Sequence, residues 1–150
     1  MMQDLKELYQ EVILDHNRNP RNFRAMEHAS CEARGHNPLC GDRLKLFLKI
    51  ENDVIEDISF EGQGCAISQA SASIMTEGLN GLSCEEARAL FDKVHQLLTV
   101  EQFDIQSLPF LKLQVLAGVR AYPARVKCAS LAWHTLIAAL KNQTDIAKTE

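Results

Sequence analysis

The sequence has no apolar run that approaches the ~20 residues that a membrane-spanning helix requires. Its opening stretch, Met1 to Tyr9, is charged and amphipathic and lacks the apolar centre of a signal peptide. Excess positive charge is also missing, because 16 Lys and Arg face 20 Asp and Glu, a net charge of −4. Nucleic acid needs a basic face. These absences predict a cytoplasmic protein that binds neither a membrane nor a nucleic acid.

The chain also lacks the cysteine patterns of several familiar protein classes. Its five cysteines are an odd number and include no C-x-x-C pair, so neither a disulfide framework nor a zinc finger is expected. In a reducing compartment, metal or thiol chemistry is the better interpretation. A Cys-His-Asp hydrolase is disfavoured, because no G-x-S-x-G or papain-like context is present.

No internal repeat, linker or low-complexity segment divides the chain. A length of 150 residues with 46% hydrophobic content suits a single domain, which at this size buries roughly 68–70% of its unfolded surface. We therefore expect one domain over residues 1–150, with residues 143–150 frayed.

Alternation of apolar and charged residues predicts the strands. The residues that alternate with Arg43, Lys45, Phe47 and Lys49 are all apolar: Leu44, Leu46, Leu48 and Ile50. A turn follows at residues 51–53, and alternation resumes through Ile58 and Phe60. This period of two predicts a β-hairpin with one buried face. A further short strand is expected from about His28 to Arg34.

Helical periodicity surrounds these strands on both sides. We expect helices over residues 5–17, over 66–77, from the Ser83–Glu86 capping box to Leu98, over 110–117 with Gly118 as the stop, and from Pro123 onward. Helices and strands are thus segregated along the chain, which predicts an α+β fold rather than a βαβ crossover fold.

Asn37 to Asp42 is the stretch richest in chemistry. Cys40 and Asp42 are two residues apart, so in extended backbone both side chains face one ion. Cys65 follows a Gly-x-Gly break at a helix N-terminus, where the dipole favours thiolate. Cys128 lies in the second turn of the last helix. Three cysteines at exposed element ends favour a metal site. The alternative is that the cysteines are three unrelated small hydrophobic residues and Asp42 is an ordinary turn residue.

Three segments resemble the signatures of the IscU-type iron–sulfur cluster assembly proteins. They are Asn37-Pro38-Leu39-Cys40-Gly41-Asp42, Phe60-Glu61-Gly62-Gln63-Gly64-Cys65-Ala66-Ile67-Ser68 and Lys127-Cys128-Ala129. The resemblance covers nearly the whole chain. It implies an IscU/SufE-like sandwich, in which a three-stranded antiparallel sheet packs against helices. It also implies that Cys40, Asp42, Cys65 and Cys128 are metal ligands.

Three departures from the general scaffolds of this family point to its SufU-like branch. Lys127 stands where those scaffolds have histidine, residues 118–125 replace their Pro-Pro-Val-Lys element, and the segment between Cys65 and Cys128 is longer. The SufU-like resemblance implies a resting Zn²⁺ site and sulfur received from a pyridoxal-phosphate-dependent cysteine desulfurase. Iron–sulfur acceptors or downstream assembly proteins are the other implied partners.

The resemblance implies a zinc-dependent sulfurtransferase, and within it the residues favour Cys40 as the acceptor and Asp42 as the residue that tunes its release from the metal. Cys40 lies in the Pro/Gly-framed loop, whereas Cys65 and Cys128 are anchored to helices. The alternatives are a scaffold on which the same residues hold a transient [2Fe–2S] cluster or iron, and a structural zinc module without transfer chemistry.

Other reactive side chains have simpler interpretations. Arg125 matches a recurrent SufU-like position, and either pairs with Asp42, contacts the partner or is a solvated charge. Lys127 is a second candidate partner contact. Cys31 and Cys84 are expected to be incidental, and His36 a surface histidine. The run of Arg18, Arg21 and Arg24 is either partner surface or solvated.

Overall fold

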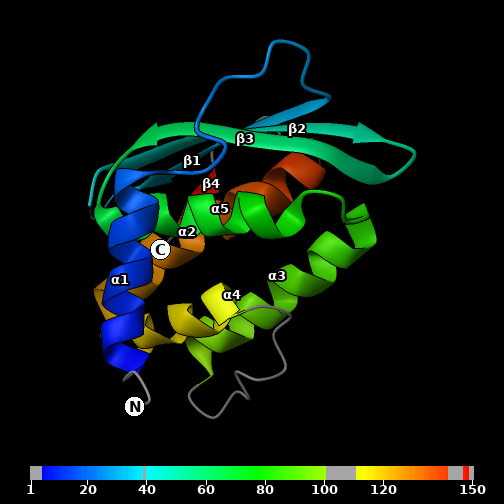
Figure 1. The fold of residues 1–150 in the computed structure, drawn as a ribbon. Coiled ribbons are helices and arrows are strands. Elements are labelled where there is room, and N and C mark those ends of the chain that lie inside the picture. Colours follow the sequence, from blue (N-terminus) through cyan, green and yellow to red (C-terminus); the bar gives the residue numbers. More distant parts are fainter. Residues whose placement is uncertain (1–4, 39, 101–110, 142–146, 149–150) are drawn as a thin grey trace.

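A computed structural model describes residues 5–38, 40–100, 111–141 and 147–148. The elements follow in the order α1 (Leu5–Arg18), β1 (Cys31–Asn37), β2 (Asp42–Glu51), β3 (Val54–Gln63), α2 (Ala66–Leu79), α3 (Cys84–Thr99), α4 (Leu111–Val115), the 3₁₀ helix η2 (Leu116–Ala121), α5 (Pro123–Leu140) and β4 (Ala147–Lys148). The helices lie on one face of the sheet, and the connection from α1 to β1 arches past the other (Figure 1). The predicted α+β fold is confirmed.

Strands β1, β2 and β3 form the predicted antiparallel sheet. The β2–β3 hairpin turns at Asn52 and Asp53, which both have positive φ (51° and 65°), the geometry of a tight two-residue turn. β1 begins and ends three residues later than expected. Its pairing with β2 runs from Cys31↔Leu48 to Asn37↔Asp42. A local sequence pattern does not predict this cross-strand register.

A fourth strand was not predicted. Ala147 and Lys148 pair in parallel with Gly35 and His36 of β1, so the sheet has the order β3-β2-β1-β4. Apart from these two residues, the predicted fraying of residues 143–150 falls outside the described part of the chain.

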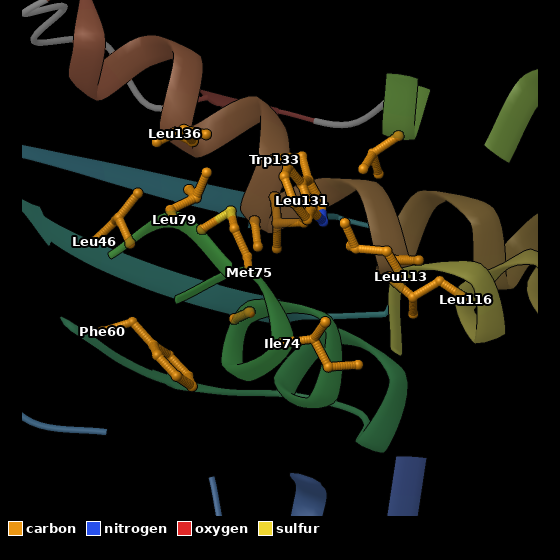
Figure 2. Packing of buried hydrophobic residues seen from close by; sticks show 14 of the residues in the cluster. Leu46, Phe60, Ile74, Met75, Leu79, Leu113, Leu116, Leu131, Trp133 and Leu136 are labelled. Carbon is orange, nitrogen blue, oxygen red and sulfur yellow. The ribbon is translucent and has the colours of Figure 1, made fainter. Parts of the chain in front are cut away.

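The core lies between the sheet and the helices α2 and α5. Trp133 of α5 packs beside Met75 and Ile74 of α2, and Leu113 and Leu116 lie next to them (Figure 2). The Trp133 indole N–H donates to Ser71 Oγ (3.2 Å), and that hydroxyl donates to the Ala129 carbonyl (2.6 Å). The polar groups of this interface are therefore paired, as buried groups must be.

The helix predicted over residues 110–117 is corrected in part. Phe110 lies outside the described residues, α4 ends at Val115, and Gly118 lies within η2 rather than stopping the helix. A Cβ at Gly118 would come within 2.8 Å of the Tyr9 ring. Glycine is needed here because α1 approaches closely, and not because a helix ends.

Within the described ranges, no helix has both the length and the apolar character needed to span a membrane.

Candidate metal centre

The connection between β1 and β2 is a tight turn that separates Cys40 from Asp42. The Gly41 N–H donates to the Asn37 carbonyl (2.9 Å), and Gly41 adopts φ 71°, which glycine permits at little cost. Cys40 is exposed in the turn, whereas Asp42 opens β2 and is fully buried. Asp42 is therefore a buried strand residue, which rules out its interpretation as an ordinary turn residue.

Cys65 is the N-cap residue of α2, close to its predicted place. Its sulfur accepts the Ser68 N–H (3.4 Å), and its own N–H donates to Asp42 Oδ1 (2.8 Å). The Cys65 Sγ also lies 3.8 Å from Asp42 Oδ2. The end of β3 and the start of α2 are thus joined to β2 through one carboxylate.

Cys128 lies on α5, and its Sγ is 3.4 Å from the Sγ of Cys40. The expectation that all three cysteines occupy exposed ends is wrong for this residue, which is only 4% exposed. The reason is that α5 packs against β1 and β2, so its second turn is covered by the sheet. Cys65 is half-buried, and only Cys40 is exposed.

Asn37 is a site residue that the sequence reasoning missed. Its side chain is fully buried, and its Nδ2 lies 3.6 Å from Cys128 Sγ and 3.5 Å from Asp42 Oδ2. The available signal was an asparagine directly before the Pro38 turn, facing Asp42 across it. Only the register of β1 and β2 places that amide inside the site.

Three of the four expected ligands lie close enough together to hold a single metal ion. One donor atom each from Cys40, Asp42 and Cys128 lie within 4.8 Å of one another, and Cys65 contacts the same carboxylate. In a tetrahedral zinc site with bonds of about 2.3 Å, neighbouring sulfurs are ~3.8 Å apart. The observed separations of 3.4 Å between sulfurs and 3.8 Å from sulfur to oxygen are close to that spacing.

Burial sets the chemistry of the innermost thiol. It raises the pKa of Cys128 far above the usual range, and contacts with the Cys40 and Cys65 thiols raise that pKa further. Without a cation Cys128 is therefore a neutral thiol at physiological pH. A bound metal ion would reverse this preference, because coordinated thiols are deprotonated.

Gly64 has no side chain, and this leaves room for the Asp42 carboxylate. A Cβ at this position would collide with Asp42 Oδ1 and lie 2.9 Å from Asp42 Cγ. The second glycine of the Gly-x-Gly break is thus explained by the close approach of the Asp42 side chain.

The two predicted partner contacts lie beside the site. The Arg125 guanidinium stacks on the Tyr122 ring, 4.2 Å from its centroid, and its charge opposes the rise in the pKa of Tyr9 that burial causes. Among the described ion pairs and hydrogen bonds, none joins Arg125 to Asp42. Lys127 is half-buried, and its carbonyl accepts the Ser130 hydroxyl (3.2 Å).

The remaining candidates lie apart from this constellation. Cys31 opens β1 at the end of the strand opposite Asn37. Cys84 is buried at the start of α3, where its N–H donates to the Asp53 carbonyl. Two members of the arginine run form ion pairs within the chain, Arg21 with Asp15 (2.7 Å) and Arg24 with Asp57 (2.7 Å).

Comparison with known families agrees with this site. The sequence profile described as "NifU-like N terminal domain" matches residues 8–129, a range that includes all four expected ligands. The chain belongs to this family. The resemblance inferred from the three signature segments is therefore confirmed.

Its relatives include both kinds of protein weighed above. The chain is 40% identical over 133 residues to the zinc-dependent sulfurtransferase SufU of Bacillus subtilis, covering 89% of each chain. It is 43% identical over 137 residues to the iron–sulfur cluster assembly scaffold protein IscU of Thermotoga maritima, covering 91% of this chain and 94% of that protein.

A solved structure matches the fold. The putative iron–sulfur cluster assembly scaffold protein for the SUF system from Fervidobacterium islandicum superposes with a TM-score of 0.82 at 35% identity, covering 89% of this chain and 97% of that one.

Proposed function

We propose that this chain acts in iron–sulfur cluster assembly by accepting sulfur at a zinc site formed by Cys40, Asp42, Cys65 and Cys128. The donor is a pyridoxal-phosphate-dependent cysteine desulfurase, and the setting is the cytoplasm. The similarity to a zinc-dependent sulfurtransferase supports this proposal. It is also supported by the grouping of the Cys40, Asp42 and Cys128 donor atoms, with Cys65 Sγ 3.8 Å from Asp42, because thiolates and carboxylates are zinc ligands.

The observation that carries the proposal is the unequal exposure of the four ligands. Cys40 is exposed in a turn, while Cys128 and Asp42 are buried beneath it and Cys65 is half-buried at a helix N-terminus. A thiol that must meet a persulfide in another protein has to be accessible. Cys40 satisfies that condition, and the other three residues are placed to hold a metal ion.

The bound metal ion would supply charge that keeps the site's thiols deprotonated near neutral pH. Cys40 then attacks the outer sulfur of the donor's persulfide, forming a new S–S bond while the donor's own S–S bond breaks. The electron pair of the broken bond leaves with the donor cysteine as thiolate. The proton of the outer sulfur stays on the new Cys40 persulfide, so no oxidant or reductant is consumed.

Asp42 is placed to tune the release of Cys40. Its Oδ1 accepts the Cys65 N–H, and its Oδ2 is 3.8 Å from Cys65 Sγ. A carboxylate is a weaker zinc ligand than a thiolate and is displaced more easily. Asp42→Ala should therefore keep most of its metal but transfer sulfur more slowly.

The direct test is mass spectrometry after brief incubation with a cysteine desulfurase and cysteine. We expect one added sulfur, about 32 Da, on the Cys40 peptide, because thiol exchange adds a single sulfur to the attacking cysteine. Cys40→Ser should abolish that transfer even where zinc remains. Persulfide appearing first on Cys65 or Cys128, with turnover retained in Cys40→Ser, would overturn the proposal.

The second candidate function is a scaffold that assembles a [2Fe–2S] cluster on the same residues. The similarity to an IscU scaffold favours it, and thiolates are the normal ligands of such clusters. Anaerobic purification separates the candidates. Coloured protein containing iron and sulfide supports the scaffold, while colourless protein with one zinc per chain supports sulfur transfer or a purely structural zinc module. Acceleration of desulfurase turnover then excludes the structural module.

A further inference from the structure

The face of the sheet that points away from the helices carries a groove of about 490 Å³. Two rows of outward side chains form its walls across three strands, in the cross-strand register. One row is Arg34, Lys45 and Glu61, and the other is His36, Arg43 and Gln63. Between the rows, Gly35, Leu44 and Gly62 form the floor, with the Leu44 side chain buried on the helix side of the sheet.

The groove is cationic although the whole protein is anionic. Its walls hold three permanent cations, Arg34, Arg43 and Lys45, against one carboxylate, Glu61, whereas the chain has a net charge of −4. Lys45 is partly neutralised by Glu32, 3.5 Å away. Within the described ranges, no carboxylate lies within 4.0 Å of either arginine in an ion pair. Both guanidinium groups are exposed and available for fork-like binding of carboxylates.

The groove lies at the metal-site end of the sheet. His36 and Arg43 form the last cross-strand pair before Asn37 and Asp42, and Gln63 is two residues before Cys65. Cys40 is in the turn that joins these strands. A molecule seated between the two rows would therefore lie on the outer face of the sheet, at the end of β1 and β2 where the turn that contains Cys40 joins them.

We propose that this groove is the docking site for an acidic, extended segment of the protein that donates sulfur to Cys40. This inference rests on the proposed function and deepens it by assigning the surface that recognises the donor. Charge selects the occupant, because Arg34 and Arg43, which form no ion pair with the residues that the structure describes, attract carboxylates and repel basic segments. Shape selects an extended segment, because a groove this small holds a few side chains and not a helix about 10 Å wide.

The test is desulfurase kinetics with this protein, in its zinc-loaded form, as the varied acceptor. Arg34→Glu/Arg43→Glu should raise KM for the acceptor about tenfold, because two attractive contacts become repulsive. The value of kcat should stay within twofold, since Cys40 and the metal ligands are untouched. Added salt should raise KM for the wild type and leave KM of the variant nearly constant.

The matched control is Arg88→Glu/Lys93→Glu, which makes the same change of charge at exposed positions of α3. We expect wild-type KM for it. Arg34→Gln/Arg43→Gln, a milder change, should give an intermediate KM, and zinc content checks that each variant keeps its site.

Three results would overturn the docking proposal. One is wild-type KM in Arg34→Glu/Arg43→Glu, and another is an equal rise in the α3 control. The third is a change of molecular mass in solution for the groove variant, which would indicate that a second copy of this chain occupies the groove. If the wild type itself accepts no sulfur, the proposed function fails and docking fails with it.

Discussion

Single atoms decide whether the candidate metal centre can form. The Asp42 carboxylate is buried, accepts the Cys65 N–H through Oδ1 and faces the backbone of Gly64. Because this oxygen already serves a hydrogen bond, the side chain cannot move aside without breaking it. The position of the Asp42 carboxylate therefore depends on Gly64, a residue that is not itself a proposed ligand.

Gly64→Ala should lower metal occupancy more than Asp42→Ala does, because the added methyl group forces Asp42 and the adjoining Cys65 apart and so displaces two proposed ligands rather than removing one. Overpacking of this kind costs about 1–3 kcal/mol of stability. The matched control is Gly41→Ala, where an added Cβ meets open space and the left-handed backbone costs only about 1 kcal/mol. Zinc content by mass spectrometry and thermal unfolding measure the two effects. Full zinc occupancy in Gly64→Ala would contradict this role of the glycine.

The proposed site divides the cysteines into ligands and residues that take no part in metal binding. Cys65→Ser or Cys128→Ser should lose the metal, whereas Cys31→Ala/Cys84→Ala should keep both the metal and sulfur acceptance. The reason is that Cys31 and Cys84 lie near the opposite end of the sheet, and neither belongs to the group of donor atoms around Asp42. Metal analysis of the purified variants checks the division. Loss of zinc from the alanine variant with its fold intact would show that a ligand had been missed.

Helix α1 is attached to α2 by a buried polar cluster rather than by apolar contacts alone. His16 is fully buried, and Ser73 Oγ lies 2.7 Å from its Nδ1 and accepts the Arg21 N–H (2.8 Å). His16 Nε2 is 3.4 Å from Glu77, which pairs with Lys112 (2.8 Å). The Ser73 hydroxyl, which has one donor and two acceptor sites, can accept the Arg21 N–H and also donate to Nδ1 of a neutral imidazole.

This cluster predicts a loss of stability in mild acid. Burial, helped by the charges of Lys112 and Arg21 and opposed by that of Glu77, lowers the pKa of His16 to about 4. The unfolded chain, with a pKa near 6.5, binds a proton between pH 6.5 and 4 that the folded state does not. Stability should therefore fall as the pH drops through this window, by about 2 kcal/mol at pH 5.

Denaturant unfolding at pH 7 and pH 5, on metal-free protein, measures this difference. His16→Gln should reduce the pH dependence, while His28→Gln, at an exposed position, should leave it unchanged. An equal dependence on pH in His16→Gln and the wild type would show that His16 is not the group responsible.

At the scale of the whole molecule, the proposed metal centre joins parts that are far apart in sequence. Its proposed ligands come from the β1–β2 turn, the junction of β3 with α2, and the second turn of α5. A metal ion held by all of them ties the sheet to the helices on its inner face (Figure 1). The apolar core is a separate source of stability, since it is built by α2, α5 and the strands.

Removing the metal should therefore lower the free energy of unfolding and Tm, but the protein should stay folded. Saturation at 100 times Kd stabilises the folded state by about 2.7 kcal/mol, which corresponds to roughly 5–10 °C in Tm at this chain length. Calorimetry with and without a chelator measures the shift, and circular dichroism should show that the helices persist. A chelated protein that loses its helices would contradict an independent core.

The sequence by itself determined the kinds and order of the main elements, and it predicted which cysteines are ligands. Helix and strand types follow from periods of 3.6 and 2 in neighbouring residues, as in the β2–β3 hairpin and the Ser83–Glu86 capping box that caps α3. The three cysteines stand in signature segments that are short and contiguous. Local pattern was sufficient for all of these features.

Only the tertiary structure decided how these pieces meet. The burial of Asp42 and Cys128, the amide of Asn37 inside the site and the pairing of β4 with β1 depend on contacts between residues far apart in sequence. Gly118 and Gly64 likewise make room for Tyr9 and for Asp42, which come from distant parts of the chain. Burial and cross-strand register arise from packing of whole elements, and no local period of the sequence encodes that packing.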